Sequence, residues 1–215
     1  MSAASRSNGL FGAGGDFVDL IACDGRLLAV VGDVSGKGVA ASLVAAVVLS
    51  SVQHHVALLG ARPGALLAAV DNSVCAMLDR TGALVTMAIA VVEPEARTVR
   101  LASAGHHPVM LATTSAVSRL GPTCPPLGAA MACRSELTES FERSASLVIV
   151  SDGITEQPNL AGEEFGLARL GRLADASRFC SPDEAIEQVL AGVEAHAGVV
   201  DAVDDRAIVI VRSEE

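Results

Sequence analysis

Apolar residues fall along this chain in two kinds of stretch: short runs rich in β-branched residues, and longer runs rich in Ala, Leu and Val. Short runs bounded by Gly, Pro or Asp predict strands, and the longer runs predict helices. The predicted strands are 17–23, 26–32, 84–92, 98–104, 109–112, 134–141, 147–150 and 207–211. The predicted helices are 39–59, 65–79, 166–174 and 182–197. Regular strand–helix alternation is missing, so the order favours an α+β domain with mainly antiparallel sheets.

Turn residues separate these elements. Asp24-Gly25 is a hairpin signal between the first two strands, Gly60 ends the first helix, and Gly82 ends the second. Ser181 is the predicted N-cap of the last helix. The chain shows no repeat, linker or low-complexity segment, and we therefore expect one domain over residues 1–215.

Composition narrows the functional classes. The chain has 215 residues, of which 51% are hydrophobic and 2% aromatic, and its formal net charge is −10. It is too apolar to be disordered, and without a basic patch interleaved with aromatic residues it is not expected to bind nucleic acid. The acidic balance reflects either solubility or carboxylates gathered at a cation site.

The apolar stretch 39–59 is interrupted by Ser, Gln and His, so it predicts a helix buried in a soluble core and not a membrane span. The N-terminus lacks the long apolar run of a signal peptide. The cysteines are odd in number, widely spaced and without a CxxC pair. This argues against a disulfide framework or a zinc ribbon and favours a reducing cytoplasm, with each cysteine a small buried or neutral residue.

Four acidic positions differ from the surface carboxylates because they lie beside glycines or at strand ends. These are Asp16, Asp33, Asp152 and the pair Asp204-Asp205. Carboxylates that point together repel one another unless a proton or a cation compensates them, and Mg²⁺ or Mn²⁺ prefers oxygen ligands. Each Asp taken alone is more often a cap for backbone N–H groups. Pattern alone therefore leaves both a cation site and a structural role open.

Several motifs, taken together, carry a family resemblance. They are GGDFVD (14–19), GDVSGKG (32–38), SAGHHP (103–108), PLG (126–128), SDGITE (151–156) and DDRAIVIV (204–211). In this order they resemble the SpoIIE/RsbU branch of the metal-dependent (PPM, type 2C) protein phosphatases, from about Gly14 to Arg212. The resemblance implies a four-layer αββα sandwich of two stacked antiparallel sheets flanked by helices. It also implies hydrolysis of phosphoserine or phosphothreonine with two Mn²⁺ or Mg²⁺ ions.

Carried over motif by motif, the resemblance implies a metal centre. Asp33 would bridge both ions and the backbone carbonyl of Val34 would bind one of them. Asp152 and Asp204 would hold the other ion, and Asp16 would bind directly or through a water. In that scheme a metal-bridging water attacks phosphorus in line, with Asp33 and Asp152 acting through it and no covalent enzyme intermediate.

Further candidates near these motifs are Gly15, Asp205, His106 and Lys37. GDVSGKG lacks the spacing of a phosphate-binding loop of nucleotide-binding proteins, because Gly38 and not Ser or Thr follows Lys37. Lys37 either attracts phosphate or is a solvated surface lysine. His106 and the neighbouring His107 suggest acid/base work, although a structural turn histidine is the more common case.

The sequence departs from the family pattern in three places. Val18 stands where relatives often have Tyr, and Ala207 stands where they usually have Thr or Ser. Losing that hydroxyl predicts weaker support for Asp204. The first strand, which in relatives precedes the GGDF motif, is either the short segment 2–8 or missing.

The function implied is that of a cytoplasmic bacterial serine/threonine phosphatase. In this branch the usual substrate is a phosphorylated anti-anti-sigma protein of the STAS class, so the resemblance implies sigma-factor regulation and a stress response. The alternative is a catalytically weak or inactive module that binds a STAS-type partner. Helices 39–59 and 65–79 either form a homodimer, as in relatives, or only cover a sheet.

Overall fold

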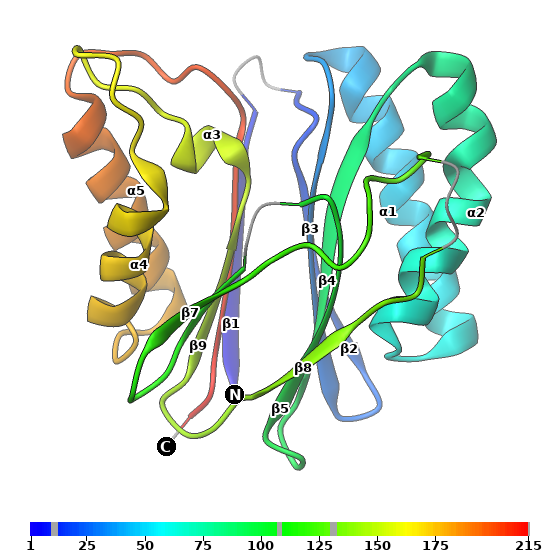
Figure 1. Cartoon of the computed structure of the whole chain (residues 1–215), viewed down its shortest axis with the longest axis horizontal. Helices are drawn as coiled ribbons and strands as arrows, with labels where there is room; N and C mark the ends of the chain where they lie inside the picture. The colour runs from blue at the N-terminus through cyan, green and yellow to red at the C-terminus, as the bar shows by residue number, and fades with distance from the viewer. Residues whose placement is uncertain (10–12, 107–108, 130–132, 215) are drawn as a thin grey trace.

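The computed structural model describes residues 1–9, 13–106, 109–129 and 133–214, and in it two five-stranded antiparallel sheets lie face to face (Figure 1). The first sheet has the order β1 (Ser2–Asn8), β10 (Arg206–Arg212), β9 (Ser146–Val150), β6 (Val109–Ala112) and β7 (Val117–Leu120). The second has the order β2 (Phe17–Cys23), β3 (Arg26–Val34), β4 (Val85–Glu93), β5 (Thr98–Ala104) and β8 (Leu137–Ser140).

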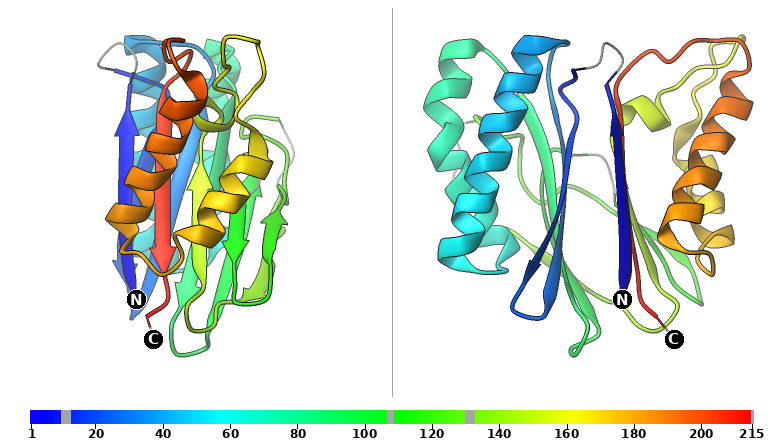
Figure 2. Two further views of the ribbon diagram at one scale, coloured as in Figure 1. Left: turned by 90° about the vertical axis from the view of Figure 1, so that its left-hand side faces the viewer. Right: turned by 180° about the vertical axis from the view of Figure 1, so that it is seen from behind.

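Helices cover the outer face of each sheet, as the two views of Figure 2 show. On the second sheet lie α1 (Val39–Leu59) and α2 (Pro63–Thr81), and on the first lie α4 (Gly166–Ala176) and α5 (Pro182–Ala197). A single turn, α3 (Asp152–Thr155), follows β9. The predicted four-layer αββα architecture is confirmed.

Three apolar layers fill the space between these elements, and the central strands contribute to two of them. In β3, Leu28 and Val30 face the layer under α1 and α2, whereas Ala29 and Val31 face the other sheet. Because both faces of such a strand are buried, its sequence is a continuous apolar run and not an alternation. Ala, Val and Leu dominate the layer between the sheets, in keeping with a chain that has few aromatic residues.

The predicted elements are present, five with the predicted bounds and the others with ends shifted by one to three residues, and the turn signals hold. Asp24 and Gly25 both have positive φ, Gly82 ends α2 in the left-handed conformation, and Ser181 caps α5 in a capping box with Glu184. The sequence reading missed β7 and α3, each only four residues long. Segment 2–8 does form the first strand, pairing with β10 along its whole length.

Helix α1 differs from the expectation of a buried core helix. One face, formed by Ala41, Ala45, Val48, Val52 and Val56, is buried. The opposite face leaves Val39, Leu43, Val47 and Leu58 exposed. By length and composition alone, α1 is long and apolar enough to cross a membrane. The prediction of a core helix is therefore right for one face only.

Cys124 and Cys133 form a disulfide, which corrects the expectation that every cysteine is a small buried or neutral residue. The chain on either side of the disulfide is held at β5: Cys124 N–H donates to the carbonyl of Ser103, and Leu137, which follows Cys133 in the chain, pairs with Leu101. The pair forms because tertiary contacts bring the two residues together, which an odd count and wide spacing do not reveal.

Candidate metal centre

Asp33 and Val34 end β3, where this strand leaves the sheet. Register places Asp33 opposite Thr86 and Val34 opposite Val85 in the neighbouring β4. Val34 is 1% exposed, and its backbone N–H donates to the Gly15 carbonyl. The buried interior of β3 thus fixes the position of the Asp33 carboxylate at one end of the sandwich.

Asp16 lies on the segment that passes from the first sheet to the second, directly before β2. A Cβ on Gly15 would lie 2.4 Å from the Val34 carbonyl oxygen, and one on Gly14 would lie 2.1 Å from Oδ2 of Asp205. Only glycine allows the backbone to pass this closely on both sides. The two glycines therefore bring Asp16 between the end of β3 and the loop that precedes β10.

The other acidic residues come from the first sheet. Asp152 begins α3 at the end of β9, and next to it a Cβ on Gly153 would lie 1.8 Å from the Asp205 carbonyl oxygen. Asp204 Oδ1 accepts a hydrogen bond from the backbone N–H of Asp205. Asp204 Oδ2 lies 3.2 Å from Nζ of Lys37, which also donates to the Val203 carbonyl.

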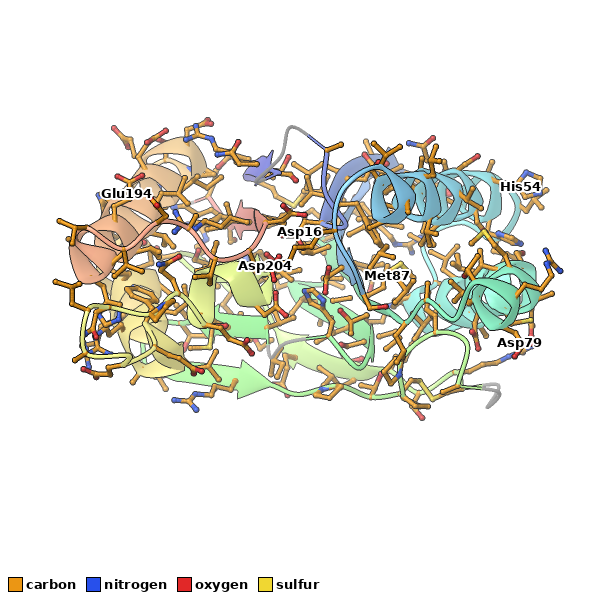
Figure 3. All side chains as sticks on the ribbon, turned by 90° about the horizontal axis from the view of Figure 1, so that it is seen from above. Asp16, His54, Asp79, Met87, Glu194 and Asp204 are labelled. Atoms are coloured by element: carbon orange, nitrogen blue, oxygen red, sulfur yellow. A yellow bond between two sulfur atoms is a disulfide. The ribbon has the colours of Figure 1, made fainter. Side chains whose placement is uncertain are left out.

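Figure 3 looks down on this end of the molecule, with Asp16 and Asp204 in the middle of the view between the two flanks of helices. The pKa values of Asp16 and Asp33 also reflect the closeness of these carboxylates. Burial raises the pKa of Asp16 from 3.8 to about 8, with further rises from the charges of Asp33, Asp152 and Asp205, although a hydrogen bond from Ser151 opposes them. Burial likewise raises the pKa of Asp33 to about 6, reinforced by Asp152, Asp204 and Asp205.

These residues fit a divalent cation by their chemistry. Their donors are carboxylate and carbonyl oxygens, the ligands of Mg²⁺ and Mn²⁺, and the raised pKa values show carboxylates whose charge lacks compensation. Within the described ranges, no group of three or more His, Cys, Asp or Glu side chains is already arranged to hold one metal ion. Ligand roles for Asp16, Asp33, Asp152 and Asp204 remain predictions.

His106 contacts Thr86, the strand neighbour of Asp33. It is 2% exposed, and its Nδ1 is 3.0 Å from Oγ1 of Thr86, the residue opposite Asp33. This placement favours a structural role. His107 lies outside the described residues.

Sequence reasoning missed Ser151, the residue that precedes Asp152. Its side chain is fully buried, and its hydroxyl donates to Oδ2 of Asp16 at 2.5 Å. The available signal was its position at the end of a buried strand, directly before a candidate ligand.

A hollow of about 430 Å³ lies far from these carboxylates, at the other end of β2 and α1. Arg26 and Arg100, two of the residues that line it, form ion pairs with Glu93, and Arg100 also pairs with Glu136. Its positive charges are therefore largely compensated by the protein itself, and the chemistry points to the carboxylate end.

The two stacked sheets with flanking helices and a carboxylate-rich end define a PP2C-type phosphatase fold. The family model named Stage II sporulation protein E (SpoIIE) matches residues 23–214, and the chain belongs to that family. The predicted SpoIIE/RsbU-like membership is confirmed. No curated protein matches the chain.

Solved structures agree on the fold. The SiaA-PP2C domain of Pseudomonas aeruginosa superposes with a TM-score of 0.90 at 20% identity, covering 99% of this chain and 86% of that one. The RsbU and RsbW domains of a Mycobacterium tuberculosis protein give 0.80 at 23% identity, covering 99% and 60%. The catalytic domain of the serine/threonine protein phosphatase PstP, solved with two manganese ions, gives 0.73 at 12% identity, covering 99% and 98%.

Proposed function

We propose that this chain is a divalent-metal-dependent phosphatase that hydrolyses phosphoserine or phosphothreonine in a protein. The observation that carries the proposal is the pair of partly buried carboxyls, Asp16 and Asp33, whose pKa values are raised to about 8 and about 6 within an acidic cluster. The end of β3, the segment before β2, the residues after β9 and the loop before β10 supply this cluster, at one end of a phosphatase fold. Raised pKa values in such a cluster are typical of functional sites.

The chain's own residues supply the oxygen donors in this proposal. Asp33 and the Val34 carbonyl lie at the end of β3 in the second sheet. Asp152 and Asp204 lie just outside strands β9 and β10 of the first sheet, and Asp16 lies between the two sheets. When bound, two Mn²⁺ or Mg²⁺ ions supply an activated water and neutralise phosphoryl charge. Lys37 Nζ lies 3.2 Å from Asp204 Oδ2, so part of its charge compensates that carboxylate.

The test is Mn²⁺-dependent release of phosphate from a phosphoserine peptide, with p-nitrophenyl phosphate as a second substrate. Asp33→Asn should abolish turnover, because the amide removes the charge of the predicted bridging ligand. Asp79→Asn, at an exposed position of α2, is the matched control and should retain it. If wild-type protein releases no phosphate with Mn²⁺ present, the proposed phosphatase activity is contradicted.

A catalytically weak module that binds a partner is the second candidate. The ion pair of Lys37 with Asp204 favours it, because a lysine competes with a cation for that carboxylate. Ala207 favours it as well, because it lacks the hydroxyl found in relatives. Binding of an unphosphorylated partner without measurable turnover of the phosphorylated form would support this candidate over the first.

For the substrate, we propose a phosphorylated STAS-class anti-anti-sigma protein, and with it a role in sigma-factor regulation and a stress response. Membership of the SpoIIE family supports this choice. A phosphorylated STAS protein should be dephosphorylated with a higher kcat/KM than a short peptide carrying the same phosphoserine. Equal values for the two substrates would contradict recognition of the folded partner.

We further propose that two copies associate through α1 and α2. Support comes from the apolar face of α1, where Val39, Leu43, Val47 and Leu58 are exposed. Light scattering should then give a dimer mass that Leu43→Glu reduces to a monomer.

We propose the cytoplasm as the location of this protein. The Cys124–Cys133 disulfide is unusual for a reducing compartment.

A further inference from the structure

Asp16, like Asp204, is a candidate ligand that no helix or strand carries. It lies between β1 and β2, after two glycines, on a backbone that crosses from one sheet to the other. Asp33, by contrast, ends a strand that is paired on both sides. Something outside its own segment must therefore hold the Asp16 side chain in one orientation.

Ser151 supplies one anchor, and its hydroxyl has a defined direction. The backbone N–H of Ala207 donates to Ser151 Oγ at 2.9 Å, so the oxygen is an acceptor there. The single hydroxyl proton is left to donate, and it goes to Oδ2 of Asp16 at 2.5 Å. Once a bound cation keeps Asp16 ionised, this hydrogen bond is charge-assisted and stronger than a neutral one. The side chain is 0% exposed, so water does not compete for these bonds.

Asp205 supplies a second anchor, which holds Gly15, the residue before Asp16. Its Oδ2 accepts the backbone N–H of Gly15 at 2.9 Å, and its side chain is 5% exposed. From the opposite side, Gly15 accepts a hydrogen bond from Val34 N–H. The backbone that carries Asp16 is thus held between the first sheet and the second.

We propose that Ser151 and Asp205 are positioning residues that fix Asp16 for cation binding. In this scheme Asp205 acts through the Gly15 backbone and is not itself a ligand, whereas Asp204 is. The inference rests on the proposed function, since it concerns the same site. It predicts that both residues affect cation affinity through their hydrogen bonds, and that the negative charge of Asp205 is not what matters.

The first experiment compares Ser151→Ala with Ser146→Ala. Ser146 is a matched control because it is a serine of the adjacent β9, 3% exposed, at the strand end remote from Asp16. Isothermal titration with Mn²⁺ alone should show roughly 10- to 100-fold weaker binding for Ser151→Ala, the loss expected when a hydrogen-bond partner of a ligand is removed. Ser146→Ala should bind as wild type does.

Thermal unfolding separates positioning from simple stabilisation. A merely structural serine would lower the melting temperature of the metal-free protein and leave the rise caused by Mn²⁺ unchanged. A positioning serine makes that rise smaller. In activity assays, Ser151→Ala should require a higher Mn²⁺ concentration for half-maximal rate, with much of the kcat recovered at saturating Mn²⁺.

Asp205 is tested with two variants that differ in one respect. Asp205→Asn keeps an oxygen that can accept the Gly15 N–H, whereas Asp205→Ala removes it. We expect Mn²⁺ affinity close to wild type for Asn and a loss of tenfold or more for Ala. Equal, large losses in both variants would show that Asp205 is a ligand and would overturn its assignment.

The outcomes distinguish this inference from the proposal on which it rests. Wild-type protein that neither binds Mn²⁺ nor hydrolyses phosphoserine overturns both. Wild-type protein that does both, with Ser151→Ala indistinguishable from Ser146→Ala, overturns the positioning role of Ser151 alone. The Asp205 pair decides its own assignment even if Ser151→Ala fails to fold.

Discussion

The carboxyl of Asp16 should make the metal-free protein less stable as pH rises from 5 to 8. Its pKa is about 8 in the folded chain, chiefly because of burial, against an ordinary value of 3.8. Between these values the folded state holds a proton that the unfolded state releases, so raising the pH favours unfolding. The stabilisation is present in full below pH 3.8 and is lost as pH approaches 8.

The size of the effect follows from the two pKa values. For Asp16 alone, linkage gives a loss of about 4 kcal/mol between pH 5 and pH 8. Typical domains unfold with only about 5–15 kcal/mol, so the loss is a large share. The pKa of Asp33 is raised to about 6, so Asp33 also lowers stability as pH rises, but its effect is complete near pH 6. Its effect is also smaller because the side chain is more exposed to solvent screening.

Urea unfolding in EDTA at pH 5, 6, 7 and 8 measures this dependence. Asp16→Asn has no proton to lose, so its stability should fall much less, and at pH 8 it should be more stable than metal-free wild type. Asp79→Asn, far from the site in Figure 3, should follow wild type. Saturating Mn²⁺ should remove most of the decline in wild type, because a bound cation compensates the charge.

Two results would refute this reasoning. Wild-type stability in EDTA that rises steadily from pH 5 to pH 8 would mean that Asp16 is ionised without cost. A decline of equal slope in Asp16→Asn would mean that other groups cause it. Comparing the two variants isolates Asp16 from every other residue that titrates in this range.

Three further changes test individual structural features. Gly15→Ala places a Cβ 2.4 Å from the Val34 oxygen and should cost roughly 1–3 kcal/mol by urea unfolding, with weaker Mn²⁺ binding. Cys133→Ser opens the disulfide to Cys124 and should cost about 3 kcal/mol by the loop-entropy argument, and dithiothreitol should then destabilise wild type but not the variant. Ser181→Ala removes the capping box of α5 and should cost about 1 kcal/mol in thermal unfolding, and an unchanged melting temperature would contradict that role.

The fold could be predicted where local signals agree with tertiary structure. Strand 17–23, the turn at Asp24-Gly25 and helix 182–197 were located from apolar runs and turn residues, and the structure has the same bounds. The short strand β7 and the turn α3 escaped because four residues carry too little periodicity. The sequence shows that a helix face is apolar but not what covers it. For this reason the pattern did not reveal that only one face of α1 is buried.

The pattern located the candidate carboxylates along the chain but not their arrangement in space. Asp33 and Asp152 stand at strand ends, which the pattern reveals, but the two strands belong to different sheets. Spacing along the chain says nothing about how two sheets stack, and only the family resemblance linked them. Ser151 was missed for a related reason: its partner Asp16 is 135 residues away, so no local pattern marks the contact.

Ala207 shows how the structure changes the meaning of a sequence departure. By the family resemblance a Thr or Ser usually stands here, and an alanine predicts weaker support for Asp204. In the structure the Ala207 side chain is buried in the apolar layer between the sheets, and its backbone N–H is bound by the hydroxyl of Ser151. Asp204 is held instead by Lys37 and by the N–H of Asp205. Ser151, the residue that follows β9, therefore places a hydroxyl at this end of the site, and that hydroxyl donates to Asp16.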